Sequence, residues 1–251
     1  MTGTIINVVA ILLGTALGVL LGGRLPERIK QTVVTGLGLF TLALGIQMFL
    51  KTQNALLVLG SLVAGALLGE WWRVEDHLSA FGDWLERKFN LERPGTGQEE
   101  DSLQQQAARE RFIRGFLTAS LVYLVGPLAI LGAIQDGLTG DFRLLAVKSM
   151  LDGFASLAFA SSLGIGVGFS AIPTLIYQGG ISLLAVQVQA IATDAMMTEM
   201  TATGGVLLLG IAISGLLELK KIRTGNFLPA LLVAPLAVAL LSALGVQLNL
   251  P

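Results

Sequence analysis

The sequence contains no cysteine and a single histidine, His77. The absence of thiols excludes disulfides, thiolate nucleophiles and cysteine-ligated metals, and one imidazole leaves metal chemistry short of donors. That histidine also falls in a polar stretch away from the apolar runs, so no Ser–His–Asp arrangement is suggested. We therefore expect no enzyme activity, no cofactor and no metal site.

Charge is scarce as well. Only 13% of the 251 residues are charged, about half of what soluble domains carry, and the formal net charge is −1. No basic patch with interleaved aromatics is present, so nucleic acid is not an expected partner. By contrast, 53% of the residues are hydrophobic, and apolar runs long enough to cross a bilayer recur along the chain. The pattern predicts an all-α, polytopic membrane helix bundle with the lipid bilayer as its partner.

The apolar runs divide residues 1–251 into about eight transmembrane helices within one membrane domain. With eight spans, 13 of the 16 Lys and Arg residues fall in loops on one side. Because basic loops stay in the cytoplasm, both termini are expected outside it. A seven-span alternative treats 163–180 as a broken or re-entrant segment. The predicted spans are 4–22, 33–50, 55–72, 115–135, 144–168, 174–192, 203–219 and 227–249.

The longest interruption of apolar sequence is 73–114, between the third and fourth predicted spans. Its first part has apolar residues at helical spacing, which predicts an amphipathic helix on the cytoplasmic leaflet. Residues 91–102 are rich in Pro, Gly and acidic side chains and predict a flexible linker, followed by a short helix at about 103–113. We expect this insertion to be a cap without chemistry of its own. The apolar residues are Val74, Leu78, Phe81, Leu85 and Phe89.

Glycines recur every four residues in two spans, as Gly14, Gly18 and Gly22 in the first and Gly65 and Gly69 in the third. Because glycine has no Cβ, such faces let helix backbones approach closely in a membrane. We expect contacts within the subunit, with a homo-oligomer through one of these faces as the alternative.

Two spans also share a pattern, LVGPLAIL at 124–131 and LVAPLAVA at 232–239. An offset of four spans suggests two parallel four-helix repeats related about the membrane normal. The alternative is that proline kinks recur in any packed membrane bundle.

The fifth predicted span carries two charges, Lys148 and Asp152. If the span enters near Arg143, Asp152 lies about 14 Å deep, near the middle of the hydrocarbon core, and Lys148 about 8 Å deep. A charge there costs about 2.5–3.5 kcal/mol on insertion scales, so it persists where it faces protein or water. These residues are the main candidates for binding a solute or ion. A self-neutralising pair that only pins helices together is the alternative reading.

Three further residues are candidates for the same site. Gln135 and Asp136 end the fourth span, close to the mouth of the fifth, and Pro127 interrupts the fourth span, where freed carbonyls coordinate cations if they line a cavity. The alternative for Gln135 and Asp136 is that they end a helix and begin a turn, and the alternative for Pro127 is that it only kinks its helix. Four amides in outer halves of spans complete a conceivable outer vestibule: Asn7, Gln47, Gln187 and Gln189.

The stretch VGPLAILGAIQDGLTGDFRLLAVKSMLDG at 125–153 resembles the hallmark of the YqgA/YdfK family of bacterial membrane proteins. GTIINVVAILLG at 3–14 and KIRTGNFLPALL at 221–232 are similar to other segments of that family. The resemblance implies a protein of the bacterial cytoplasmic (inner) membrane, in a family of unknown function that is sometimes labelled as transporters. It supplies neither a substrate nor a mechanism.

These observations favour a secondary transporter or ion-coupled exchanger with an acidic site near the midplane, for a small solute, a proton or another cation. A channel would use the same polar path. A membrane scaffold or signalling protein would use the charges for packing and act through its cytoplasmic segment. Fold resemblance does not separate these classes.

Overall fold

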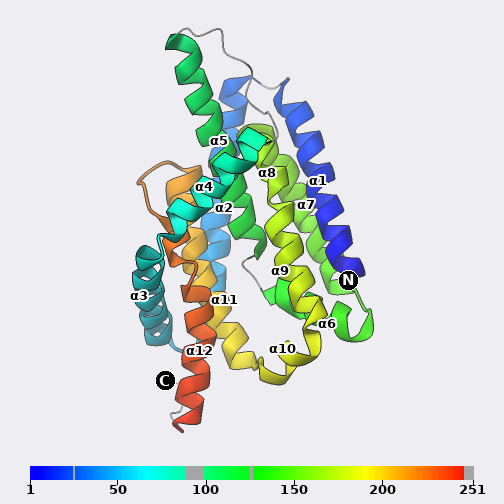
Figure 1. Cartoon of the computed structure of the whole chain (residues 1–251), viewed down its shortest axis with the longest axis vertical. Coiled ribbons are helices and arrows are strands. Elements are labelled where there is room, and N and C mark those ends of the chain that lie inside the picture. The colour runs from blue at the N-terminus through cyan, green and yellow to red at the C-terminus, as the bar shows by residue number, and fades with distance from the viewer. Residues whose placement is uncertain (25, 89–98, 125–126, 246–251) are drawn as a thin grey trace.

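The computed structural model describes residues 1–24, 26–88, 99–124 and 127–245, and within these ranges all regular structure is helical (Figure 1). The long, apolar helices expected from the sequence are therefore present. They are α1 (Thr2–Gly22), α2 (Glu27–Phe49), α3 (Ala55–Trp71), α4 (Val74–Lys88), α5 (Glu99–Leu124), α6 (Pro127–Thr139), α7 (Arg143–Leu163), α8 (Gly166–Phe169), α9 (Ala171–Leu183), α10 (Ala185–Ile191), α11 (Asp194–Ile211), the π-helix η1 (Ala212–Leu216), the 3₁₀ helix η2 (Thr224–Phe227) and α12 (Ala230–Ala243).

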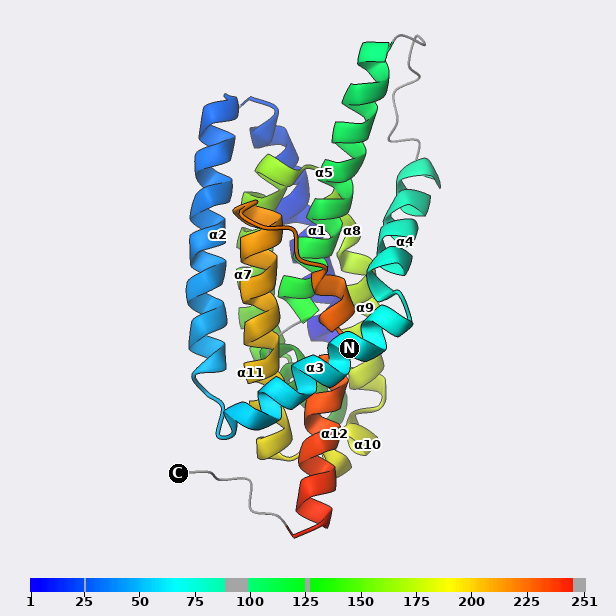
Figure 2. The same cartoon turned by 90° about the vertical axis from the view of Figure 1, so that its left-hand side faces the viewer.

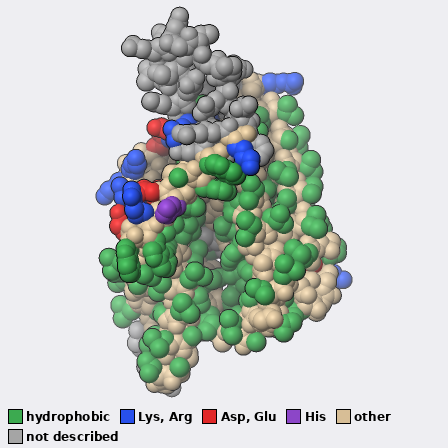
Figure 3. Space-filling model, in the orientation of Figure 1, with side chains coloured by type: hydrophobic (Ala, Val, Ile, Leu, Met, Phe, Trp, Pro, Cys, Tyr) green, Lys and Arg blue, Asp and Glu red, His purple; other side chains and the backbone are tan. Residues whose placement is uncertain are grey.

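By length and apolar composition, five helical stretches are able to span a membrane, and three bent helix pairs bring the number to eight if each pair is one span. The upper value equals the predicted number. On the face shown in Figure 3, hydrophobic side chains cover much of the surface, whereas most Lys, Arg, Asp and Glu side chains lie toward the upper end. The five stretches are Thr2–Gly22, Gln31–Phe49, Arg143–Leu163, Asp194–Leu216 and Thr224–Ala243.

The course of the chain fits an even number of spans. Helix α1 begins and α12 ends at the same, lower end of the bundle, while the α1–α2 connection and the start of α5 lie at the upper end (Figures 1 and 2). Loops predicted to share the cytoplasmic side thus share one end of the molecule. Which end faces the cytoplasm stays a prediction.

Close helix packing at the predicted glycine face joins α1 to α7. A Cβ added at Gly14, Gly18 or Gly22 would lie only 2.2, 2.4 or 2.2 Å from a carbonyl oxygen of α7. Successive glycines meet successive turns, so the two helices run in the same direction and touch along their length. The contact is within the chain, as expected. The carbonyl oxygens belong to Gly153, Leu157 and Ser161.

The insertion at 73–114 follows the prediction only in its first part. Helix α4 forms and packs on α5, with the Phe81 and Phe116 rings 5.9 Å apart. The predicted separate helix at 103–113 is wrong, because α5 runs unbroken from Glu99 to Leu124 with Gly115 as its only helix-weakening residue. Most of the predicted linker falls on 89–98, outside the described residues.

Three span boundaries also differ from the prediction. Helix α7 ends at Leu163, because Gly164 takes φ +79°, and a helical run over Gly166–Leu183 follows. That run bends by 77° into α10, at Leu184, where neither Pro nor Gly signals a break. Helix α11 begins at Asp194 rather than near residue 203.

Glu199 lies within α11, whose start is capped by the Thr193 hydroxyl accepting from the Met196 N–H at 3.2 Å. Its carboxylate is buried and accepts hydrogen bonds from the Thr52 hydroxyl at 2.6 Å and from the backbone N–H groups of Gln53 at 2.8 Å and Asn54 at 3.2 Å. Glu199 therefore closes the α2–α3 turn onto α11.

The predicted pair of parallel repeats is not confirmed. The first pattern spans the end of α5 and the start of α6, and α6 packs against α7, α9 and α10, whereas the second pattern lies within α12, which packs against α3 and α11. Proline kinks that recur in a packed bundle account for the shared pattern without duplication.

Candidate functional site

Two buried charges on α7 meet amides from α1 and α9. Lys148 and Asp152 are only 6% and 7% exposed, and the Lys148 ammonium donates a hydrogen bond to Asp152 Oδ2. The same carboxylate oxygen accepts from Asn7 Nδ2 at 2.9 Å, and that nitrogen also lies 3.2 Å from Gln178 Oε1. We call these four residues the ion-pair network. Lys148 and Asp152 lie four residues apart on α7, Asn7 lies on α1 and Gln178 lies on α9. Three helices therefore contribute side chains to a single site.

A tyrosine covers the inner side of this network. Lys148 Nζ lies 5.9 Å from the centroid of the Tyr123 ring, a cation–π distance, and Tyr123 Oη is 2.7 Å from Ser156 Oγ one turn beyond Asp152. The tyrosine is completely buried. Opposite charges in contact, an amide donor and an aromatic face are the conditions under which ionised groups persist away from water. The network is therefore electrically neutral as a whole.

Several polar atoms beside the ion-pair network have no hydrogen-bond partner in the part of the chain that the structure describes. Leaving such a buried group unpaired costs about 1–3 kcal/mol, so five of them approach the entire stability of an ordinary protein. We therefore expect these atoms to have hydrogen-bond partners other than the described protein groups. We call the residues the polar row, and its unpaired atoms are Thr4 Oγ1, Asn7 Oδ1, Thr174 Oγ1, Gln178 Nε2 and Ser182 Oγ.

Asp136 lies at the end of the bundle where α1 begins, as expected of a residue at the mouth. Its side chain is fully buried, and Oδ2 accepts from the backbone N–H of Gly3 at 3.0 Å and pairs with the Met1 amine at 3.0 Å. Gly3 is one turn from Asn7 on α1, so the helix connects Asp136 to the ion-pair network. Asp136 Oδ1 is buried without a partner among the described residues. The contacts seen are those of a carboxylate at a helix N-terminus.

Gln135 is not brought into the network, and the predicted role of Pro127 is not tested. Gln135 Nε2 donates to Asp141 Oδ2 at 3.3 Å in the α6–α7 turn, which matches the simpler reading of a helix end. Pro127 is the first residue of α6, a position that suits proline, and the α5–α6 axis bends by 62° there. Residues 125–126 and the Pro127 side chain lie outside the described residues, so its predicted role stays a prediction.

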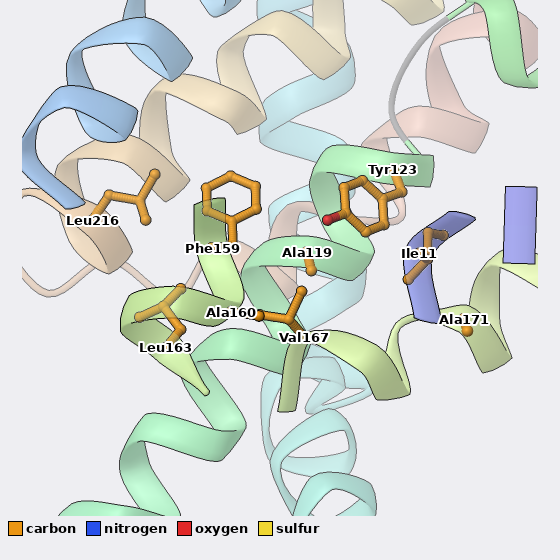
Figure 4. Packing of buried hydrophobic residues seen from close by; sticks show 9 residues of the cluster. All are labelled: Ile11, Ala119, Tyr123, Phe159, Ala160, Leu163, Val167, Ala171 and Leu216. Carbon is orange, nitrogen blue, oxygen red and sulfur yellow. The ribbon is translucent and has the colours of Figure 1, made fainter. Parts of the chain in front are cut away.

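An apolar cluster lies on the other side of the network, toward the C-terminal end of α7. On α7 it starts within a turn of Ser156 and extends to Leu163, which also lines a polar cleft of about 500 Å³ beside Arg111 and Arg114. Apolar side chains thus separate the ion pair from this cleft. Figure 4 shows the cluster, whose buried members are Ile11, Ala119, Tyr123, Phe159, Ala160, Leu163, Val167, Ala171 and Leu216.

Two important members of the site were missed by the sequence reasoning. Gln178 and Tyr123 are polar groups inside apolar runs, which is the signal that was available. Of the amides considered for a vestibule, Asn7 enters the network, whereas Gln47, Gln187 and Gln189 are exposed on the bundle surface. No group of three or more metal-binding side chains occurs among the residues that could be searched.

Comparison with known proteins matches residues 2–239 to the family model described as "Protein of unknown function (DUF554)". The chain is 35% identical over 240 residues to the "Uncharacterized protein YqgA" of Escherichia coli (strain K12), covering 94% of this chain and 96% of that protein. It is 31% identical over 252 residues to the "Uncharacterized membrane protein YdfK" of Bacillus subtilis (strain 168), covering 98% and 100%. No solved structure matches significantly.

Proposed function

We propose that this chain, which belongs to the DUF554 family and is a multi-pass membrane protein, is a secondary transporter or ion-coupled exchanger. The cargo would be a small solute or ion, and the bacterial cytoplasmic membrane its location. Asp152 and Lys148 would form the binding site with Asn7 and Gln178, and the chain would act without enzymatic chemistry.

The observation that carries this proposal is the ion-pair network itself. A carboxylate and an ammonium buried among transmembrane helices are costly, and apolar residues would pack there more easily. Asp152 shares its oxygen between Lys148 and Asn7, while Asn7 Oδ1 and Gln178 Nε2 stay unpaired in the described structure. A proton or cation that reaches Asp152 competes with Lys148 for the carboxylate. Such competition is a direct means of coupling binding to rearrangement.

The apolar cluster favours a transporter over a channel. It lies between the network and the cleft beside Arg111, so a continuous polar path across the membrane would need the cluster to move. Alternating access has this arrangement, whereas a channel needs a path open to both sides at once. A scaffold would use the same charges for packing only, and the unpaired polar atoms count against that reading.

The test is flux into proteoliposomes that contain the purified protein. Proton movement is followed with an enclosed pH dye while monovalent cations and small organic solutes are applied as gradients. The decisive variant is the double substitution Lys148→Gln with Asp152→Asn, because it removes both charges and leaves no unpaired one in the membrane.

We expect flux in the native protein, its loss in the double variant, and its retention in Asp141→Asn, whose carboxylate lies in the α6–α7 turn. Flux that persists in a folded double variant would refute Asp152 and Lys148 as the site. Absence of any flux in the native protein over the full panel would leave the scaffold function as the better explanation.

A further inference from the structure

The polar row has a regular geometry along α9. Thr174, Gln178 and Ser182 are four residues apart, so they lie on one face with a rise of about 6 Å from one to the next. Two hydrogen bonds through one water span about 5.6 Å, since each is about 2.8 Å long. One water between neighbours would therefore satisfy the unpaired groups of adjacent residues in the row.

The row continues onto α1 and reaches the bundle end where Asp136 lies. Asn7 Nδ2 lies 3.2 Å from Gln178 Oε1, and Thr4 stands one turn nearer to the start of α1. At the other end, the backbone of Ser182 packs on Gly137, where an added Cβ would be 2.1 Å from the Ser182 carbonyl oxygen. Asp136 precedes that glycine. The row thus runs from Ser182 and Thr4, near Asp136, to Gln178 and to Asn7, which donates to Asp152, and Thr174 continues it one turn beyond Gln178.

All five side chains of the row are neutral, and each is at least nine-tenths buried. Hydroxyl and amide groups both donate and accept hydrogen bonds, so they order water without binding a cation strongly. At the inner end, the Lys148 ammonium occupies Asp152 Oδ2 and repels a second cation, whereas a proton neutralises the carboxylate directly.

We propose that the polar row holds a file of bound water through which protons from the Asp136 end of the bundle reach Asp152. The inference rests on the proposed function, because it takes Asp152 as the group that the protons serve. It adds the coupling ion, the side of entry and the residues that form the path.

The presence of water is tested with single cysteines, because the native chain contains none. N-ethylmaleimide reacts with the thiolate, which forms only where water solvates it. The test variants are Thr4→Cys and Thr174→Cys, in which a small side chain without a described hydrogen bond is replaced by one of similar size. The control is Thr15→Cys on α1, which is also buried and unpaired but borders an apolar groove of about 700 Å³.

We expect the two cysteines of the row to be modified at least ten times faster than the control, as measured by mass spectrometry on protein in lipid vesicles. Equal rates at all three positions, or no modification at either row position, would overturn the inference. This measurement needs no substrate, so it decides whether the path is hydrated even if no flux is found for the native protein.

The proton role is tested by making the row apolar. The combined variant Thr4→Val with Ser182→Ala nearly keeps the side-chain volumes and removes the two hydroxyls between Asp136 and the amides, and Thr15→Val is its matched control. Proton flux in proteoliposomes should fall at least tenfold in the combined variant and stay near the native value in the control. Unchanged flux in a folded combined variant would refute proton passage through the row, even if cysteine labelling shows it to be hydrated.

Discussion

The contact between α1 and α7 predicts a large difference between two chemically identical substitutions. In Gly14→Ala the new Cβ would lie 2.2 Å from the Gly153 carbonyl oxygen and 3.0 Å from the Ser156 Cβ, so the helices must separate by about an ångström to reach ordinary contact. Overpacking of this kind costs about 1–3 kcal/mol. In Gly60→Ala nothing lies within 4 Å of the new Cβ, and the higher helix propensity of alanine favours the folded state.

The two variants are compared by heating the detergent-solubilised protein and measuring the fraction that remains monodisperse on size-exclusion chromatography. At about 2–4 °C per kcal/mol for a chain of this size, Gly14→Ala should melt about 2–12 °C below the native protein. Gly60→Ala should melt at or slightly above the native temperature. A Gly14→Ala variant as stable as Gly60→Ala would show that the α1–α7 backbones are not in close contact, and the register drawn from the glycines would be wrong.

Three other predictions concern charges and topology. Asp152→Asn alone leaves Lys148 buried without its partner and should destabilise the protein by about 3–5 kcal/mol. Adding Lys148→Gln to the same chain should restore most of that loss. Additive effects of the two substitutions in the thermal assay would argue against a buried pair. Asp136→Asn weakens the charged contact at the start of α1 and should lower the free energy of unfolding by about 0.5–2 kcal/mol. The control Asp141→Asn, in the exposed turn, should lower it by no more than about 0.5 kcal/mol. Equal melting temperatures of the two variants would contradict this prediction. Reporter enzymes fused to either end of the chain should be active outside the cytoplasm only, because the basic loops lie at the opposite end of the bundle; activity inside the cytoplasm would reverse the orientation.

Sequence periodicity was sufficient for the helical class and the glycine face, because each depends on local composition over many residues, and the eight predicted spans are the upper value of the five to eight that the helices allow. The burial of Asp152 and Lys148 was also predictable, since lipid does not tolerate lone charges. The other residues of the site were not predictable in this way. Whether an amide such as Gln178 faces the bundle or the lipid depends on the rotation of its helix, which is set by packing against distant segments.

Helix ends were the weakest predictions for a related reason. The bend at Leu184 has no proline or glycine to signal it, and the burial of Glu199 within α11 depends on a turn more than a hundred residues earlier in the chain. Asp136 illustrates the same limit in the site. Its position at the bundle end followed from the sequence, but its bond to the Gly3 backbone required the parallel arrangement of α1 and α7.

The pairing of α1 with α7 also constrains how the protein is made. Asn7 and Asp152 are 145 residues apart in sequence. At about 5–20 residues per second, the ribosome needs roughly 7–30 s to add the second after the first. During that interval α1 is in the membrane with Asn7 and its glycine face unpaired, open to association with other nascent helices. The α1–α7 pair therefore closes only after more than half of the chain has been made, and a chain truncated before α7 would leave the glycine face of α1 without its partner.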